Sequence, residues 1–244
     1  MAVNRDSNGY TFGFAVALVV VVGVLLAGIA MWTKPFQEKN QEVKKKMDIL
    51  KAILTKDDYS EITRKNAKDE FEKYVNLDDA IVLDMNGALK DTAAFDIDIK
   101  KQFRDKKLKE ENKDYPMFIA TIDGKKAYVI PCVGKGLWGP VWGNICLDED
   151  MRTIKGASFD HKTETPGLGA EIKQDFFIKG WIGETISDEN GDFAKFEVVK
   201  DKSGSTKPSK VDGITGGTIT SKGVEEMVNR CLLPYIAYFK TLKN

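Results

Sequence analysis

An uncharged apolar segment of 22 residues, from Thr11 to Trp32, limits the folds that are open to this chain. A helix needs roughly 20 apolar residues to cross the hydrocarbon core of a bilayer. Tyr10 and Trp32 stand at the two ends, where aromatic side chains meet the membrane interface. A cleaved signal peptide is the alternative, with residues 28–30 as its cleavage site, but such peptides have apolar regions of only about 7–15 residues. We therefore expect a retained single-pass membrane helix over residues 11–32.

The charged residues of the chain balance, since 37 Lys and Arg stand against 37 Asp and Glu. Nucleic-acid-binding domains carry a basic surface, so we expect no nucleic acid as a partner. The single histidine argues against a metal site built on histidine ligands, and we expect no metal. Cys132, Cys146 and Cys231 form no CxxC pair and no zinc spacing. We interpret them as small buried apolar residues.

Charge alone does not decide which side of the membrane the rest of the chain occupies. Lys34, Lys39 and residues 44–46 follow the apolar segment, whereas only Arg5 precedes it. Counted by the positive-inside rule, these lysines favour a cytoplasmic domain. They are interleaved with glutamates, however, and they open a long domain, whose translocation depends little on charge. The two arguments point in opposite directions.

The rest of the sequence predicts one α+β domain with an antiparallel sheet and flanking helices. Apolar spacing predicts helices within residues 36–54, 67–75 and 224–242. Asp123-Gly124 is a strong turn signal between two alternating apolar runs, and it predicts a hairpin over residues 116–136. We expect further strands within residues 80–87, 144–162 and 192–202, and a polar loop over residues 200–210. The predicted parts are a short cytoplasmic tail (1–10), the transmembrane helix (11–32), a helical connector (33–75) and the α+β domain (76–244).

Three glycine-rich stretches fit neither a core nor an ordinary surface: "GKGLWGPVWG" (134–143), "HKTETPGLG" (161–169) and "DGITGGTITSKGV" (212–224). Glycine lets the backbone approach a ligand closely, and tryptophan offers a flat apolar face. Ordinary turns would explain the first two stretches almost as well. The third runs into the last predicted helix, whose first N–H groups favour an anion such as phosphate. Capping by Thr220 or Ser221 explains only part of it, and it matches neither the P-loop nor the dinucleotide fingerprint.

The third stretch also carries the pattern Asp-x-x-(Ser/Thr)-Gly-(Ala/Ser)-Thr, over residues 212–218. This pattern is read by the flavin transferase that joins FMN to a threonine through a phosphoester. With its N-terminal anchor and these three stretches, the chain resembles, over nearly its full length, the family of the covalent FMN-binding C subunit of the sodium-translocating NADH:quinone reductase. Gly217 stands where that family has a small alanine. Because glycine keeps the space small, we expect the modification to survive.

The resemblance implies a covalent FMN on the hydroxyl of Thr218 and a role for each glycine-rich stretch. The first two stretches would close around the isoalloxazine ring, and the third would leave room for the phosphate and the transferase. No catalytic residue is expected, because the flavin carries the redox chemistry. The implied cofactor-binding residues are Thr218 at the attachment point, Asp212, Thr215, Gly216 and Gly217 in the motif, Trp138 and Leu168 as the apolar wall, and Glu164, Thr165 and Gly169 in the polar loop.

The resemblance further implies an electron-carrying component of a sodium-pumping NADH:quinone oxidoreductase. It would take electrons from an iron–sulfur centre and pass them to a second covalent-FMN membrane subunit on the way to quinone. The implied partners are the other subunits of the complex and, during maturation, the flavin transferase. The family places the FMN-binding domain (76–244) outside the cytoplasm, on the inner (plasma) membrane. Two alternatives are the G subunit of an Rnf-type electron transport complex, which also carries covalent FMN, and a cofactor-free membrane-anchored interaction module.

Overall fold

The structure, a computed structural model, describes residues 7–243, and the chain divides into two compact units that meet between Lys45 and Lys46. Helix α1 (Asn8–Ile53) contains almost all of the described part of the first unit and ends in the second, and it runs without interruption through Pro35. This helix is long and apolar enough to cross a membrane, and the apolar side chains of its membrane-length segment are exposed. The membrane segment and the helix predicted after it therefore form one helix. Most of the predicted tail, including Arg5, lies outside the described residues.

The second unit is built on an antiparallel sheet with the strand order β2-β1-β3-β4-β5-β6. The hairpin predicted at Asp123-Gly124 is confirmed: it joins β3 to β4, and both turn residues have positive φ, 51° and 77°. Two-residue hairpin turns need this backbone conformation, which Asp-Gly readily adopts. The strands are β1 (Ile81–Leu83), β2 (Leu89–Lys90), β3 (Tyr115–Ile122), β4 (Lys125–Lys135), β5 (Pro140–Leu147) and β6 (Ile154–His161).

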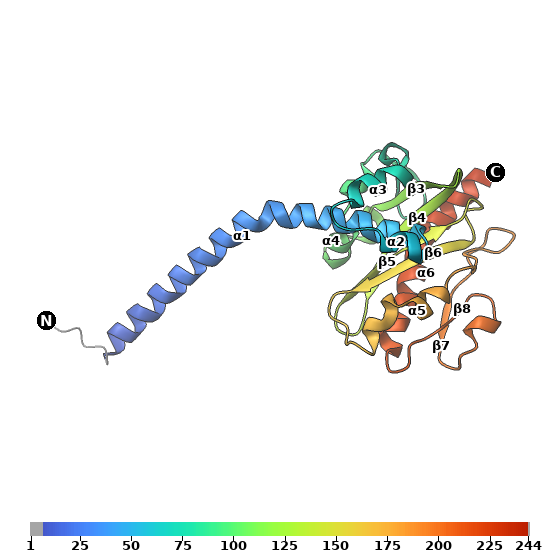
Figure 1. The fold of residues 1–244 in the computed structure, drawn as a ribbon. Helices are drawn as coiled ribbons and strands as arrows, with labels where there is room; N and C mark the ends of the chain where they lie inside the picture. The colour runs from blue at the N-terminus through green and yellow to red at the C-terminus, as the bar shows by residue number, and fades with distance from the viewer. Residues whose placement is uncertain (1–6, 244) are drawn as a thin grey trace. The chain divides into compact units, whose positions relative to one another are not determined.

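Helices pack beside the sheet (Figure 1), and the side chains form two separate cores, one on each face. Side chains alternate along a strand, so Tyr128 and Ile130 of β4 enter one core and Val129 enters the other. The first core lies under helix α6 (Thr218–Lys243) and helix α5 (Asp175–Lys179). The second contains the last turns of α1 and helix α3 (Ala67–Tyr74). The predicted α+β fold with an antiparallel sheet and flanking helices is confirmed.

The end of α1 is fixed to the sheet by polar contacts as well as by apolar packing. Asn144 Nδ2 and Ser158 Oγ donate hydrogen bonds to the carbonyl oxygen of Asp48, at 3.1 and 3.0 Å. Gly156 of β6 lies directly against the carbonyl of Ala52, where no side chain would fit. The compact unit therefore includes, from Lys46 onward, part of the segment that the sequence predicts as a connector.

The strand predicted within residues 192–202 does not join the main sheet. It is shortened to β7 (Glu197–Val199), which pairs in parallel with β8 (Lys210–Asp212). Helix α6 supports this small sheet, because the Val198 N–H donates to Glu225 Oε2 at 2.6 Å. The other elements are α2 (Lys56–Ser60), α4 (Ile99–Arg104) and short 3₁₀ helices at Leu77–Asp79, Ala94–Asp96, Glu110–Asn112, Gly169–Lys173 and Gly204–Thr206.

Candidate functional site

The carboxylate of Glu164 brings the three glycine-rich stretches together. Its Oε1 accepts hydrogen bonds from the N–H groups of Trp138 and Gly139, at 2.8 and 3.3 Å. Its Oε2 accepts a hydrogen bond from Thr220 Oγ1 at 2.6 Å. One side chain thus joins the β4–β5 loop, the segment after β6 and the first turn of α6. We call this contact the Glu164 junction.

Glu164 is only 4% exposed, which is unusual for a carboxylate. Burying a charge is costly unless hydrogen bonds compensate for the lost water. Within residues 7–243, the partners of this carboxylate are neutral N–H and O–H groups. The junction therefore depends on hydrogen bonds to the anion, which are stronger than those between neutral groups.

Glycines flank the Glu164 junction because the carboxylate occupies the space that a side chain would need. A Cβ added at Gly136 would lie 2.5 Å from Glu164 Oε1, and one added at Gly169 would lie 2.6 Å from Glu164 Oε2. The same atom at Gly169 would overlap the hydroxyl of Thr220. These two glycines are therefore explained by close packing around one buried anion.

The segment after β6 is held in a tight turn. The carbonyl of Thr165 accepts hydrogen bonds from Leu168 N and Ala170 N, both at 3.1 Å, while its side chain is exposed. His161 Nδ1 accepts a hydrogen bond from Glu164 N at 3.2 Å, so a neutral His161 carries its proton on Nε2. That Nε2 atom is buried and has no hydrogen-bond partner within the described part of the chain.

Asp212, the first residue of the predicted attachment motif, stabilises a neighbouring loop. It ends β8, and its Oδ1 accepts a hydrogen bond from Gly204 N at 2.8 Å. The next residue, Gly213, donates its N–H to the carbonyl of Val199 at 2.8 Å. Thr215 lies in the exposed turn that follows. The structure thus gives Asp212 an intramolecular contact in addition to any role in recognition.

Ser221 braces the turn that leads into α6. Its hydroxyl accepts from Ile214 N at 3.1 Å and donates to the Gly217 carbonyl at 3.0 Å. Helix α6 starts at Thr218, so Thr220 and Ser221 lie inside its first turn, and the interpretation of either as the N-cap is wrong. Thr218 is half-buried. Its position at the start of a 26-residue helix suits a phosphate, because the helix dipole there favours an anion.

Apolar side chains are exposed beside this helix terminus. Trp138 is 67% exposed and Leu168 is 42% exposed. Leu168 lies against the turn before Thr218, since a Cβ added at Gly216 would come within 2.5 Å of Leu168 Cδ2. The backbone of Trp138 is joined through Glu164 to the first turn of α6, so an exposed aromatic residue, Leu168 and a hydroxyl at a helix N-terminus belong to one region. These groups suit a flat phosphorylated cofactor. The residues present therefore fit FMN.

The structure brings together most of the site residues predicted from the sequence. The contacts described above connect five of them: Trp138, Glu164, Leu168, Gly169 and Gly216. Gly217 joins this group because it packs against the backbone of Leu168. Sequence reasoning missed Thr220 as a partner of Glu164. The available signal was helical spacing, because Thr220 shares an apolar stripe with Val224, Met227 and Cys231.

The fold and this site define the class of protein. Residues 136–233, which contain the Glu164 junction and Thr218, match the FMN-binding domain family. A solved structure of the Na(+)-translocating NADH-quinone reductase C subunit from Parabacteroides distasonis is 36% identical, with a TM-score of 0.73, over 84% of this chain and 96% of that one. The chain belongs to the family of the Na(+)-translocating NADH-quinone reductase C subunit.

Other relatives agree with this assignment. The Na(+)-translocating NADH-quinone reductase C subunit of Pseudomonas aeruginosa is 29% identical, over 93% of this chain and 92% of that protein. The structure of Shewanella oneidensis NqrC, at 23% identity, shares the fold, with a TM-score of 0.68 over 84% of this chain and 98% of that one. The family assignment and the FMN-binding domain disfavour a cofactor-free interaction module.

The two adjacent glycines of the motif should respond differently to alanine. Gly216 has φ +75°, where only glycine is unstrained, and its added Cβ would press on Leu168. We expect Gly216→Ala to lower the free energy of unfolding by about 1–2 kcal/mol. At Gly217 the added Cβ would lie 3.0 Å from Ile214 and from the Leu168 backbone, which small shifts relieve, so the expected loss is below about 1 kcal/mol. Urea denaturation of both variants tests this order, and a larger loss for Gly217→Ala would contradict it.

Proposed function

We propose that FMN is attached through a phosphoester to the Thr218 hydroxyl. The observation that carries this proposal is the position of Thr218. It is half-buried, it is the first residue of α6, and it directly follows two glycines. Gly216 and Gly217 let the turn before Thr218 pack closely against Leu168, and the N-terminus of the helix favours the charge of the phosphate. A covalent bond to the protein would prevent loss of the cofactor.

The exposed side chains near Thr218 would hold the isoalloxazine ring. Trp138 and Leu168 provide an apolar wall, because both expose surface that a planar ring would cover. Thr165 offers an exposed hydroxyl in the same loop. Glu164 would act mainly by fixing the loops, because its two carboxylate oxygens already accept hydrogen bonds from the protein.

We propose that the protein relays electrons within a sodium-pumping NADH:quinone reductase. When bound, FMN supplies one- and two-electron redox chemistry. The chain itself binds and orients the flavin and leaves one side open, since Trp138 and Leu168 lie at the surface. Electrons would come from an iron–sulfur centre and pass to a second covalent-FMN subunit on the way to quinone, while NADH and sodium bind to other subunits. A membrane-anchored protein also fits the apolar helix α1.

Flavin fluorescence of the denatured protein in a gel tests the attachment. The chain is produced together with a flavin transferase of this specificity, beside Thr218→Ala and a control, Thr241→Ala, from the other end of α6. Denaturation releases a non-covalent flavin, so a fluorescent band is expected in the wild type and the control and should vanish in Thr218→Ala. A band that persists in Thr218→Ala would place the flavin elsewhere, and no band in any lane would refute covalent attachment.

The side of the membrane can be tested separately. We propose that the large domain lies outside the cytoplasm of a cell whose inner membrane holds α1. Protease added to intact spheroplasts should then cleave the domain, and cleavage that occurs only after lysis would overturn this orientation.

A further inference from the structure

Two buried thiols that the proposed function does not use lie against each other in the first core. Cys132 belongs to β4 and Cys231 belongs to α6, and the two thiols are close enough to influence each other's ionisation. Cys231 Sγ also approaches the carbonyl oxygen of Val133, at 3.7 Å. Both cysteines are free and nearly inaccessible to solvent, at 0% and 4% exposed.

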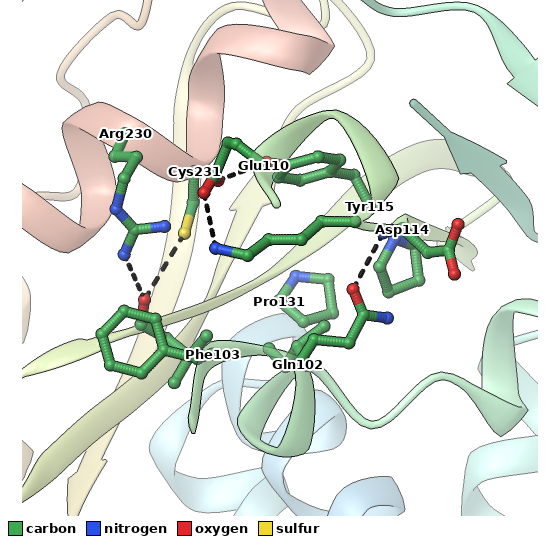
Figure 2. A pocket seen from close by; sticks show the side chains of 12 residues that line it. Gln102, Phe103, Glu110, Asp114, Tyr115, Pro131, Arg230 and Cys231 are labelled. Carbon is green, nitrogen blue, oxygen red and sulfur yellow. Dashed lines mark hydrogen bonds and ion pairs between the residues drawn. The ribbon is translucent and has the colours of Figure 1, made fainter. Parts of the chain in front are cut away.

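A small cavity reaches one of these thiols and not the other. Figure 2 shows Cys231 among the side chains that line a cavity, together with Tyr115, Pro131 and Arg230. The volume of this cavity is about 30 Å³. Cys132 is not among the residues that line it. The cavity admits only a group of a few atoms, so the end of a small reagent can reach Cys231 while Cys132 stays behind it.

The neighbouring charges favour ionisation of the thiol that the cavity reaches. Arg230 Nη2 donates to the Val133 carbonyl at 2.7 Å, the same oxygen that Cys231 approaches (Figure 2). The adjacent Cys132 thiol lowers the pKa of Cys231, and the Arg230 charge lowers it further, although burial acts in the opposite direction. The adjacent Cys231 thiol, together with burial, raises the pKa of Cys132. Since the thiolate is the nucleophile, Cys231 reacts first.

We propose that Cys231 and Cys132 form a thiol–disulfide exchange site for small aliphatic disulfides. The Cys231 thiolate attacks one sulfur of the disulfide RS–SR, the S–S bond breaks, and RS⁻ leaves and takes up a proton. Cys132 then loses its proton and attacks Cys231 Sγ, and the second RSH leaves. The two cysteines lose two electrons, and the small disulfide gains them as two thiols. The product links β4 to α6, the helix that begins at Thr218.

The test uses the full chain under native conditions with 2-hydroxyethyl disulfide, followed by acid quenching, alkylation of the remaining thiols and peptide mapping by mass spectrometry. We expect a peptide pair cross-linked through Cys132 and Cys231, while Cys146 stays alkylatable. Cys146 is the matched control because it is also buried, and burial raises its pKa to about 12. Modification of Cys231 should be at least about tenfold faster than that of Cys146, because Cys231 lines the cavity beside Arg230 and Cys146 does not.

Variants resolve the order of the two steps. Cys132→Ser should stop at the mixed disulfide on Cys231, Cys231→Ser should not react, and Cys146→Ser should behave like the wild type. The cross-link should also raise the melting temperature, because it restrains the unfolded chain. Equal reaction of all three cysteines, or an unchanged rate in Cys231→Ser, would overturn the proposal. The wild-type peptide map decides the question even if a variant fails to fold, and it does not depend on flavin attachment.

Discussion

Replacing Glu164 with alanine should lower the free energy of unfolding by about 3 kcal/mol or more. The substitution leaves the half-buried N–H groups of Trp138 and Gly139 and the buried hydroxyl of Thr220 without their acceptor, and a donor left buried and unsatisfied costs about 1–3 kcal/mol. Removing a buried charge offsets part of this loss. Because the three glycine-rich stretches meet at this side chain, the exposed Trp138 should also lose its fixed position. Urea denaturation and tryptophan fluorescence measure the two effects.

Two substitutions serve as controls for this prediction. Glu164→Gln keeps the shape and one acceptor oxygen, so its loss should lie near about 1–2 kcal/mol. Glu171→Ala removes a half-buried carboxylate that accepts a hydrogen bond from Gly167 N at 2.9 Å in the same loop, and it should cost less than about 1 kcal/mol. Equal losses in Glu164→Ala and Glu171→Ala would show that the Glu164 junction does not stabilise the fold.

Gly156→Ala should be the other strongly destabilising substitution, with a loss of about 3 kcal/mol. The added Cβ would overlap the carbonyl oxygen of Ala52. Because that oxygen belongs to the backbone, no side-chain rotation can relieve the overlap. The end of α1 would have to move away from β6, which would break the hydrogen bonds from Asn144 and Ser158 to Asp48. Chemical denaturation of residues 46–244 within the full chain measures the change.

Gly180→Ala is the matched control for Gly156→Ala. Its added Cβ would meet the tip of the Val211 side chain at 3.0 Å, and its backbone is already helical, with φ −67°. We expect a loss below about 1 kcal/mol. If Gly156→Ala were equally mild, the last turns of α1 would not be packed tightly on the sheet.

Local signals predicted much of the fold. The Asp123-Gly124 hairpin was predictable because a two-residue turn demands a backbone that few sequences adopt. The apolar stripe of the last helix was predictable from its spacing. Of the residues that form it, only Leu242 is exposed, and the others are buried: Val224, Met227, Val228, Cys231, Leu232, Tyr235 and Phe239. In both places one short segment contains all the information that its structure needs.

Features that depend on distant partners were not predicted. A strand was predicted at β7, but its parallel pairing with β8 was not, because both strands are only three residues long and depend on each other and on α6 for their backbone partners. Glu164 stands in a polar turn of the sequence, where a solvated carboxylate is the ordinary expectation. Its burial follows from two segments that the sequence places far away on either side, so the convergence of the glycine-rich stretches was expected only from the family resemblance.

The way the motif from Asp212 to Thr218 is folded has a consequence for biosynthesis. In the finished domain Asp212 is bound to Gly204, Ile214 is buried and Thr218 is wound into a helix, so the motif is not an accessible peptide. An enzyme that reads these residues as one extended stretch would have to act before this region closes or during its reopening. Attachment and folding would then compete in time, and variants that fold more slowly here would acquire more cofactor per chain rather than less.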